Sequence, residues 1–299
     1  MGGVLLIDKA SGCTSHDVVY KVRKLLGVRQ VGHAGTLDPL ASGLMVIMVG
    51  QATKISNLLL SDEKGYEVGI RLGTETDTFD VTGNTVRVRP TEHLDLAQIK
   101  EAIERLQGEI PLEIPAFSAV KVDGKKLYEY ARQKEEVPIL VRTSRFYNLR
   151  ILELGQNICR LQFECSKGAY VRAWVHQLGQ DLGCGASVET LRRLKSGPFL
   201  IEQAIPLPGL SLEEARSRLI PMENTLLGWL PVDIEGQDEK MILNGRISNE
   251  VEERIFQLVA NGRNPSQFKL ISRADRHLLA LVSSGQARRL DIFRVFPRI

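Results

Sequence analysis

At 299 residues the chain is longer than most single domains, and its composition, 43% hydrophobic and 25% charged, is that of an ordinary globular protein. The formal net charge of +3 is too small to indicate a nucleic-acid-binding protein by itself, so a basic surface would have to come from local clustering. The four cysteines form no CxxC pair, which argues against a zinc site or a disulfide framework. No stretch approaches about 18 apolar residues, so neither export nor membrane spanning is expected, and we expect a cytoplasmic protein.

The first part of the chain alternates short apolar runs with turn residues. Hydrophobic residues recur at helical spacing between Ser15, a candidate cap, and Gly27. Apolar and polar residues then alternate after Tyr66, which predicts a half-buried strand with Tyr66 on its apolar face. The expected elements are a strand over 4–7, a helix over 15–26, a strand over 44–49, a short helix over 55–59 and a strand over 66–72.

The stretch GHAGTLDPLASG, residues 32–43, places a single carboxylate on a loop just before an apolar strand. Pro39 restricts Asp38 to extended backbone angles, and the glycines keep the segment free of bulk. A carboxylate on such a loop is a common catalytic group, because the scaffold is rigid while the loop is accessible. The alternative is a simple turn in which Asp38 bonds its own backbone.

The middle of the chain predicts a mixture of strands and helices. Pro111 and Pro115 indicate an extended connection. Arg172 falls in the first turn of a helix, where the helix dipole disfavours a cation, so a specific anionic partner for Arg172 is a reasonable hypothesis. The expected elements are a loop over 73–83, a strand over 86–88, a helix over 99–106, a strand over 117–122, a helix over 125–133, two long strands of which the second covers 159–165, a helix over 171–182, a turn over 196–199 and a helix over 211–219.

Short strand patterns at close intervals dominate the chain beyond residue 230. They cover 254–260, 267–272, 278–282 and 290–296. We therefore expect two domains, a larger one over 1–230 that contains Asp38 and a small β-rich domain over 231–299.

Most recognisable chemistries are absent. The sequence contains neither a G-x-S-x-G elbow nor a GxxxxGK[ST] phosphate loop, and its five histidines are scattered. We expect no metal and no redox cofactor. What remains is Asp38, with Arg172 and Tyr66 on other segments. A neighbouring guanidinium would keep a carboxylate charged, but spacing alone does not show that these residues meet.

The motif GHAGTLDPLASGLM closely resembles the signature of bacterial tRNA pseudouridine-55 synthases of the TruB family. Further segments match the family in the same order along the chain, up to residue 199. They are Asp8-Lys9, Gly12-x-Thr14-Ser15, Lys64-Gly65-Tyr66, Ser118-Ala119-Val120-Lys121, the run Cys165–Arg172, Leu191-Arg192-Arg193 and Gly197-Pro198-Phe199. The sequence departs from the usual family pattern at Ala10, Ala169 and Ile114-Pro115, none of which removes a chemical group.

The resemblance implies an α+β pseudouridine-synthase fold, with a central mixed, mainly antiparallel sheet flanked by helices and a C-terminal PUA-like RNA-binding domain. It implies that a uridine at position 55, in the T loop of tRNA, is isomerised to pseudouridine. Asp38 would be the essential carboxylate, Tyr66 would stack on the uracil, and Arg172 would hold Asp38 charged and oriented. Lys9, His33, Lys167, Tyr170 and Leu191 would bind the substrate, with His33 as a candidate wedge.

Other classes of function stay open at this point. A tRNA-folding or assembly factor would use the same surface with catalysis secondary. A small-molecule hydrolase or lyase has only the lone aspartate in its favour. The partner expected is the T arm of tRNA. No protein partner is implied, and a monomer is the default expectation. A basic cluster that could bind RNA comprises Arg142, Arg145, Arg150, Arg160, Lys167 and Arg172.

Overall fold

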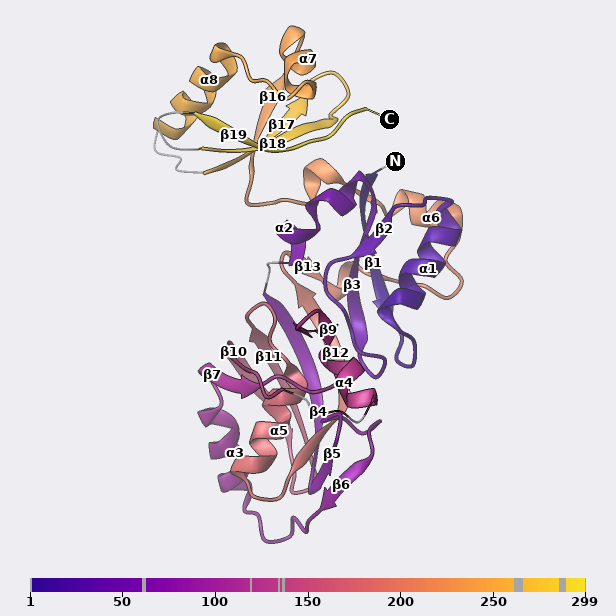
Figure 1. Cartoon of the computed structure of the whole chain (residues 1–299), viewed down its shortest axis with the longest axis vertical. Coiled ribbons are helices and arrows are strands. Elements are labelled where there is room, and N and C mark those ends of the chain that lie inside the picture. Colours follow the sequence, from indigo (N-terminus) through magenta and orange to yellow (C-terminus); the bar gives the residue numbers. More distant parts are fainter. Residues whose placement is uncertain are drawn as a thin grey trace.

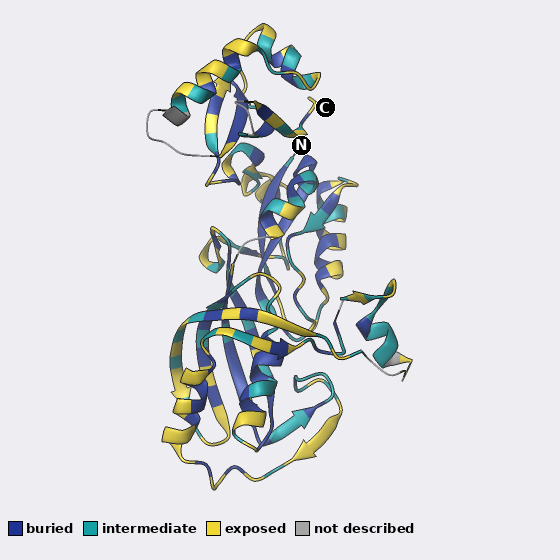
Figure 2. Ribbon diagram, turned by 60° about the vertical axis from the view of Figure 1, so that its left-hand side comes forward, coloured by how far each residue is buried: buried dark blue, intermediate teal, exposed yellow. Residues whose placement is uncertain are grey.

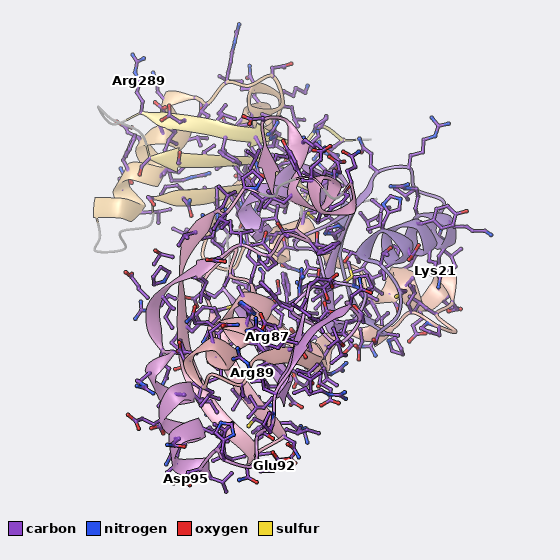
Figure 3. All side chains as sticks on the ribbon, turned by 60° about the horizontal axis from the view of Figure 1, so that its bottom comes forward. Lys21, Arg87, Arg89, Glu92, Asp95 and Arg289 are labelled. Atoms are coloured by element: carbon purple, nitrogen blue, oxygen red, sulfur yellow. The ribbon has the colours of Figure 1, made fainter. Side chains whose placement is uncertain are left out.

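A computed structural model describes residues 2–60, 63–118, 120–133, 135, 138–260, 266–284 and 289–298. The molecule is elongated, with the C-terminal region at one end of the long axis and the central sheet running through the remainder (Figure 1). Figure 3 places Glu92 and Asp95 at the end opposite Arg289, and Lys21 points outward from the side.

The first 230 residues form one large sheet, two small two-stranded sheets and short helices. The strands are β1 (Gly2–Lys9), β2 (Val31–His33), β3 (Ser42–Gly50), β4 (Lys64–Leu72), β5 (Thr74–Thr76), β6 (Thr85–Val88), β7 (Gly108–Glu113), β8 (Lys121–Val122), β9 (Lys125–Lys126), β10 (Val141–Leu154), β11 (Ile158–Cys165), β12 (Ala186–Ser196), β13 (Phe199–Leu200), β14 (Ile205–Pro206) and β15 (Ile220–Pro221). The helices are α1 (Ser15–Leu26), α2 (Ser56–Leu60), α3 (Leu96–Arg105), α4 (Leu127–Arg132), α5 (Val171–Asp181) and α6 (Leu212–Ser217), with 3-10 turns η1 (Gln51–Ile55), η2 (Ile201–Gln203) and η3 (Met222–Asn224).

The large sheet has the order β14-β1-β3-β12-β4-β11-β10-β7, with β2, β13 and β15 paired alongside. Its pairs are antiparallel except β1 with β14 and β3 with β12, which are parallel. The expected mixed, mainly antiparallel sheet flanked by helices is therefore confirmed. Figure 2 shows the long central strands mostly in the buried colour and the helices with both buried and exposed residues.

Strands β1 and β3 are buried on both faces, which explains why they read as continuous apolar runs. Leu5, Ile7, Met45 and Ile47 face the core that contains Val18 and Val22 of α1, whereas Val4, Leu6, Leu44, Val46 and Met48 face a second cluster. This alternation follows from the two-residue period of a strand.

Helix α1 begins one residue earlier than the candidate cap implied. Thr14 is the cap: its hydroxyl accepts a hydrogen bond from the Asp17 amide, and the Asp17 carboxylate accepts one from the Thr14 amide. The Ser15 hydroxyl instead bonds the backbone of Leu37, in the loop that carries Asp38. The serine expected to cap the helix thus ties the helix to that loop.

One predicted strand in the first 230 residues is shorter in the structure than expected. Of the strand expected over 117–122, only β8 is present among the described residues, because Phe117 and Ser118 lie in a bend; Ala119 lies outside the described residues. Pro111, expected in an extended connection, lies within the strand β7. The proline is tolerated there because β7 is the edge strand of the sheet, where one side needs no ladder hydrogen bond.

The C-terminal region forms a four-stranded sheet with two helices and its own core. Its elements are β16 (Leu230–Ile234), α7 (Gln237–Leu243), α8 (Asn249–Ala260), β17 (Gln267–Ser272), β18 (Leu278–Ser284) and β19 (Leu290–Val295). Three of the four expected strands are confirmed, but the strand over 254–260 is wrong, since these residues belong to α8. Val251 and Ile255, four residues apart, are fully buried on one face of that helix.

The C-terminal sheet packs onto the first part of the chain through a shared apolar cluster. Ile271, Leu281 and Phe296 join the second cluster, on the face of β1 and β3 turned away from α1. The Gln51 side chain also donates a hydrogen bond to the Pro297 carbonyl at 2.6 Å. The division at residue 230 stays a prediction, as does the PUA-like RNA-binding role. No helix among the described residues is long and apolar enough to cross a membrane.

Candidate active site

A buried lysine fixes the loop that carries Asp38 by hydrogen bonds to its backbone carbonyls. Lys9, at the end of β1, is 1% exposed, and its ammonium donates hydrogen bonds to the carbonyls of Ala41 (2.5 Å), Ala10 (3.0 Å) and Pro39 (3.4 Å). Burial lowers the pKa of Lys9 from its ordinary value. Together with Ser15, which bonds both the amide and the carbonyl of Leu37, the ammonium holds the loop in one conformation.

Asp38 meets Arg172 directly. The Arg172 Nε donates to Asp38 Oδ2 at 2.8 Å, and the side chains are 6% and 38% exposed, respectively. The remaining guanidinium nitrogens donate to the carbonyls of Thr78 (2.8 Å) and Phe117 (3.0 Å). The guanidinium is therefore fixed in its plane, while the partly exposed carboxylate keeps an open side for a ligand.

A second carboxylate lies behind the arginine. Asp80 Oδ2 is 4.0 Å from Arg172 Nε, and the Asp80 side chain is 7% exposed. Its other oxygen accepts hydrogen bonds from Thr78 Oγ1 (3.0 Å) and from the amide (3.0 Å) and hydroxyl (2.5 Å) of Thr82. Two carboxylates thus face one cation, and Asp38 is the more exposed of the two.

Tyr66 and Arg193 form the inner wall. Burial raises the pKa of Tyr66 above its ordinary value, and the neighbouring Arg193 guanidinium opposes this rise without cancelling it. Arg193, 1% exposed on β12, donates to the carbonyls of Leu44 (2.6 Å) and Gly35 (3.1 Å). Gly43, with φ +99°, allows β12 to pass close to β3, because a Cβ there would clash with the Arg193 backbone.

These groups surround a cavity of about 1060 Å³. Six of the eight residues expected at the site line it: Asp38, Tyr66, Lys167, Tyr170, Arg172 and Leu191. They come from four separate segments of the chain, which the sheet and the start of α5 bring together. Lys167 is exposed at its rim, in the loop between β11 and α5, and Leu191 is buried in its wall.

Two expected substrate-binding residues do not line this cavity. The Lys9 ammonium binds the loop carbonyls described above and stabilises the loop without facing the cavity. His33 ends β2, opposite Ile47 of β3, and its Nδ1 is buried with no hydrogen-bond partner among the described residues. Burial, followed by the charge of Arg193, lowers the pKa of His33, so the ring is neutral at pH 7.

The cavity also contains residues that were not in the expected set. They include Asp80 and Arg193 in the enclosed part, and Tyr128 and Arg142 in the part formed by the α4 segment and β10. Arg193 stood in a motif quoted for the family resemblance, and Arg142 in the suggested basic cluster, so both carried a sequence signal. Asp80 lies in a Thr- and Asp-rich stretch with no such signal. The described residues contain no group of three or more His, Cys, Asp or Glu that could hold a metal ion.

Two solved structures match nearly the whole chain in fold. A chain of a Cbf5-Nop10-Gar1 complex covers 98% of this chain and 84% of its own length, with a TM-score of 0.66 and 24% identity. A chain of an H/ACA RNP bound to a substrate RNA containing 2′-deoxyuridine covers 99% and 85%, with a TM-score of 0.66 and 22% identity. At these identities the likeness concerns the fold.

Two family models define a pseudouridylate synthase. The model of the TruB family pseudouridylate synthase N-terminal domain matches residues 23–171, and that of the tRNA pseudouridylate synthase B C-terminal domain matches residues 172–226. The tRNA pseudouridine synthase B of Bdellovibrio bacteriovorus is 40% identical over 298 residues, 98% of this chain and 96% of that protein. That of Aromatoleum aromaticum is 41% identical over 248 residues, 82% and 80% of the two chains. The chain belongs to the TruB family.

Proposed function

We propose that this enzyme isomerises the uridine at position 55, in the T loop of tRNA, to pseudouridine. The observation that carries the proposal is the carboxylate of Asp38, half-exposed in a cavity of about 1060 Å³ and paired at 2.8 Å with a buried arginine. The relatives named above are called tRNA pseudouridine synthase B, which supports tRNA as the substrate.

The chemistry is an isomerisation without net oxidation. The bond between C1′ and N1 breaks, the detached uracil turns, C1′ bonds to C5, the proton on C5 is lost and N1 gains a proton. Asp38 assists the first step, either by attacking C1′ or by removing the 2′ proton. Both routes require a carboxylate with one open side, and the bond to Arg172 engages one oxygen of Asp38 while its side chain stays partly exposed.

Tyr66 acts in this scheme as a neutral phenol. Because burial raises its pKa, the side chain keeps its proton at pH 7 and is not a ready phenolate base. Its ring lies in the wall of the cavity, where it can stack on the uracil and hold the base while it turns. Leu191, on the neighbouring strand, offers an apolar contact to the base.

Capture of the RNA falls to the open side of the cavity. Lys167 and Arg142 place positive charge there, where phosphates of an extruded nucleotide would lie. Tyr170 and Tyr128 add aromatic rings that can stack on bases of a T loop. Extrusion of a base costs a few kcal/mol, which these contacts offset.

The test is release of tritium from tRNA transcripts that carry C5-labelled uridine. The wild-type enzyme should release label from a transcript with uridine at position 55 and not from one with cytidine there. The Asp38→Asn variant, which keeps the shape of the side chain, should lose about 10²- to 10⁴-fold or more in turnover while binding the same transcript.

A second outcome would favour a different function. If the wild type bound the transcript tightly and released no tritium, a tRNA-folding factor would explain the protein better. If Asp38→Asn kept full turnover, the assignment of the essential carboxylate would be wrong even though the enzyme class stood.

A further inference from the structure

One face of α5 contacts the segment 75–80 at three successive turns. Arg172, His176 and Gln180 are spaced four residues apart and therefore share that face. Arg172 donates to the Thr78 carbonyl, and Gln180 donates to Glu75 Oε1 at 3.3 Å. The arginine of the site is thus the end of a stripe that continues along the helix away from the cavity.

The middle contact of this stripe is an aromatic stack. The rings of His176 and Phe79 lie 3.9 Å apart between centroids and 11° from parallel. His176 Nδ1 is also 4.0 Å from Glu75 Oε1. Neither ring lines the cavity described above, so the stack does not touch the substrate space.

Phe79 has a backbone conformation that a bulky residue rarely adopts. Its φ is +63°, in the left-handed region, where its Cβ is crowded against its own backbone. The Phe79 carbonyl accepts a hydrogen bond from the Val188 amide at 2.9 Å, and the Val81 amide donates to the Val188 carbonyl at 2.9 Å. The turn is therefore fixed to β12 on one side and to α5 on the other.

The residues on either side of Phe79 are the ones that face the arginine. Thr78 supplies a carbonyl to Arg172 Nη1, and Asp80 places a carboxylate 4.0 Å from Arg172 Nε. The left-handed turn at Phe79 directs both groups toward Arg172 while its own ring points to His176. A residue without an aromatic ring at 79 would lose the contact that holds this turn against α5.

We propose that Phe79 and His176 are positioning residues, whose stack holds the Thr78–Asp80 turn in the place that orients Arg172 toward Asp38. They act through Arg172 and not on the substrate. The role in turnover rests on the proposed function, whereas the positioning of Arg172 is a property of the folded protein alone.

The test compares variants that remove an aromatic ring of the stack with variants that keep it. Phe79→Gly accepts the left-handed angle without strain but has no ring, whereas Phe79→Tyr keeps the ring. We expect Phe79→Gly and His176→Ala to lower kcat about tenfold with little change in KM, since a small misplacement of a catalytic group slows the chemical step. Phe79→Tyr and His176→Phe, which keep the stacked pair, should stay within about threefold of the wild type.

A structural measurement makes the inference independent of the assay. In a crystal structure of Phe79→Gly, the Arg172 Nε to Asp38 Oδ2 distance should exceed the 2.8 Å seen in the wild type. An unchanged distance, or equal kcat in the Gly and Tyr variants, would overturn the proposal. Failure of the wild type to release tritium would instead refute the proposed function, and the crystallographic comparison would still decide the positioning role.

Discussion

The charged side chains on the enclosed side of the cavity are fixed by several hydrogen bonds, whereas those on the open side have few. On the enclosed side Arg172 and Arg193 are each fixed by at least three hydrogen bonds, and Asp80 is buried among threonine hydroxyls. On the open side Arg142 makes one hydrogen bond to a described residue, at 3.3 Å to the Gly168 carbonyl. Lys167 has no polar partner within the part of the chain that the structure describes.

In the proposed function, this difference in fixation distinguishes the residues that act in the chemical step from those that bind the RNA. A group that must stabilise a short-lived charge works best when it is oriented before the substrate arrives. A group that meets a flexible RNA backbone can keep its own freedom, because it acts through charge and not through a fixed angle. Substitutions on the enclosed side should therefore change kcat, and those on the open side should change KM and its dependence on salt.

Arg172→Ala should produce the largest effect among these predictions. It removes the partner of Asp38 and leaves two backbone carbonyls unpaired, so we expect kcat to fall roughly 10²- to 10³-fold with a smaller change in tRNA affinity. Arg172→Lys is the matched control, since it keeps the charge but cannot donate in three directions. Equal losses in kcat and affinity would contradict the separation.

Lys9→Met should weaken the fold as well as the site. The ammonium bonds three loop carbonyls and is almost fully buried, so its removal should cost about 1–3 kcal/mol of unfolding free energy. Urea denaturation of the two proteins would measure this, and kcat should fall because the Asp38 loop is less well fixed. Unchanged stability would show that the loop does not depend on the lysine.

Lys167→Ala should affect capture alone. We expect KM to rise a few-fold, kcat to stay constant, and the salt slope of binding to decrease by about one, as for the loss of one phosphate contact. Lys100→Ala is a suitable control, because Lys100 is exposed on α3, does not line the cavity, and has Glu104, at 3.8 Å, as its ion-pair partner among the described residues. If both variants behaved alike, Lys167 would not be a contact of the RNA.

Acidification should give the smallest effect. Burial lowers the pKa of His33 and of His176, the latter against the opposing charges of Glu75 and Glu113. The unfolded chain then binds more protons below about pH 6.5, so stability should fall as the pH drops through that value. Thermal unfolding at pH 7.5 and 5.5 should show a smaller loss for His176→Phe than for the wild type. His93→Gln, at an exposed position, should behave as the wild type.

Secondary structure was predicted correctly from the sequence where apolar residues recurred with a clear strand or helix periodicity. Residues 267–272 are a strand at the predicted bounds, and 44–49 lie inside β3. The prediction failed for 254–260 because that window begins after Val251, the first residue of the buried stripe of α8. Strand β12 was not recognised, because its buried positions include Arg193, and an arginine is ordinarily read as exposed.

The site was predictable in its residue types and not in its assembly. Asp38 and Arg172 are separated by 134 positions, and no periodicity within either segment indicates that they meet. Their pairing was expected from family resemblance alone. The turn at Phe79 could not have been inferred either, since nothing in the sequence predicts a left-handed phenylalanine.

The double-sided burial of β1 also constrains how the molecule is made. This first strand pairs with β3, which follows it closely in the sequence, but its other neighbours are β14 and β15, and Val4 and Leu6 on one of its faces belong to the apolar cluster that contains Phe296. Such distant contacts slow folding, because long loops must close before the contacts can stabilise the strand. Until the last strands leave the ribosome, β1 presents a bare edge and an apolar face, so assembly of this enzyme should depend on protection of the nascent chain.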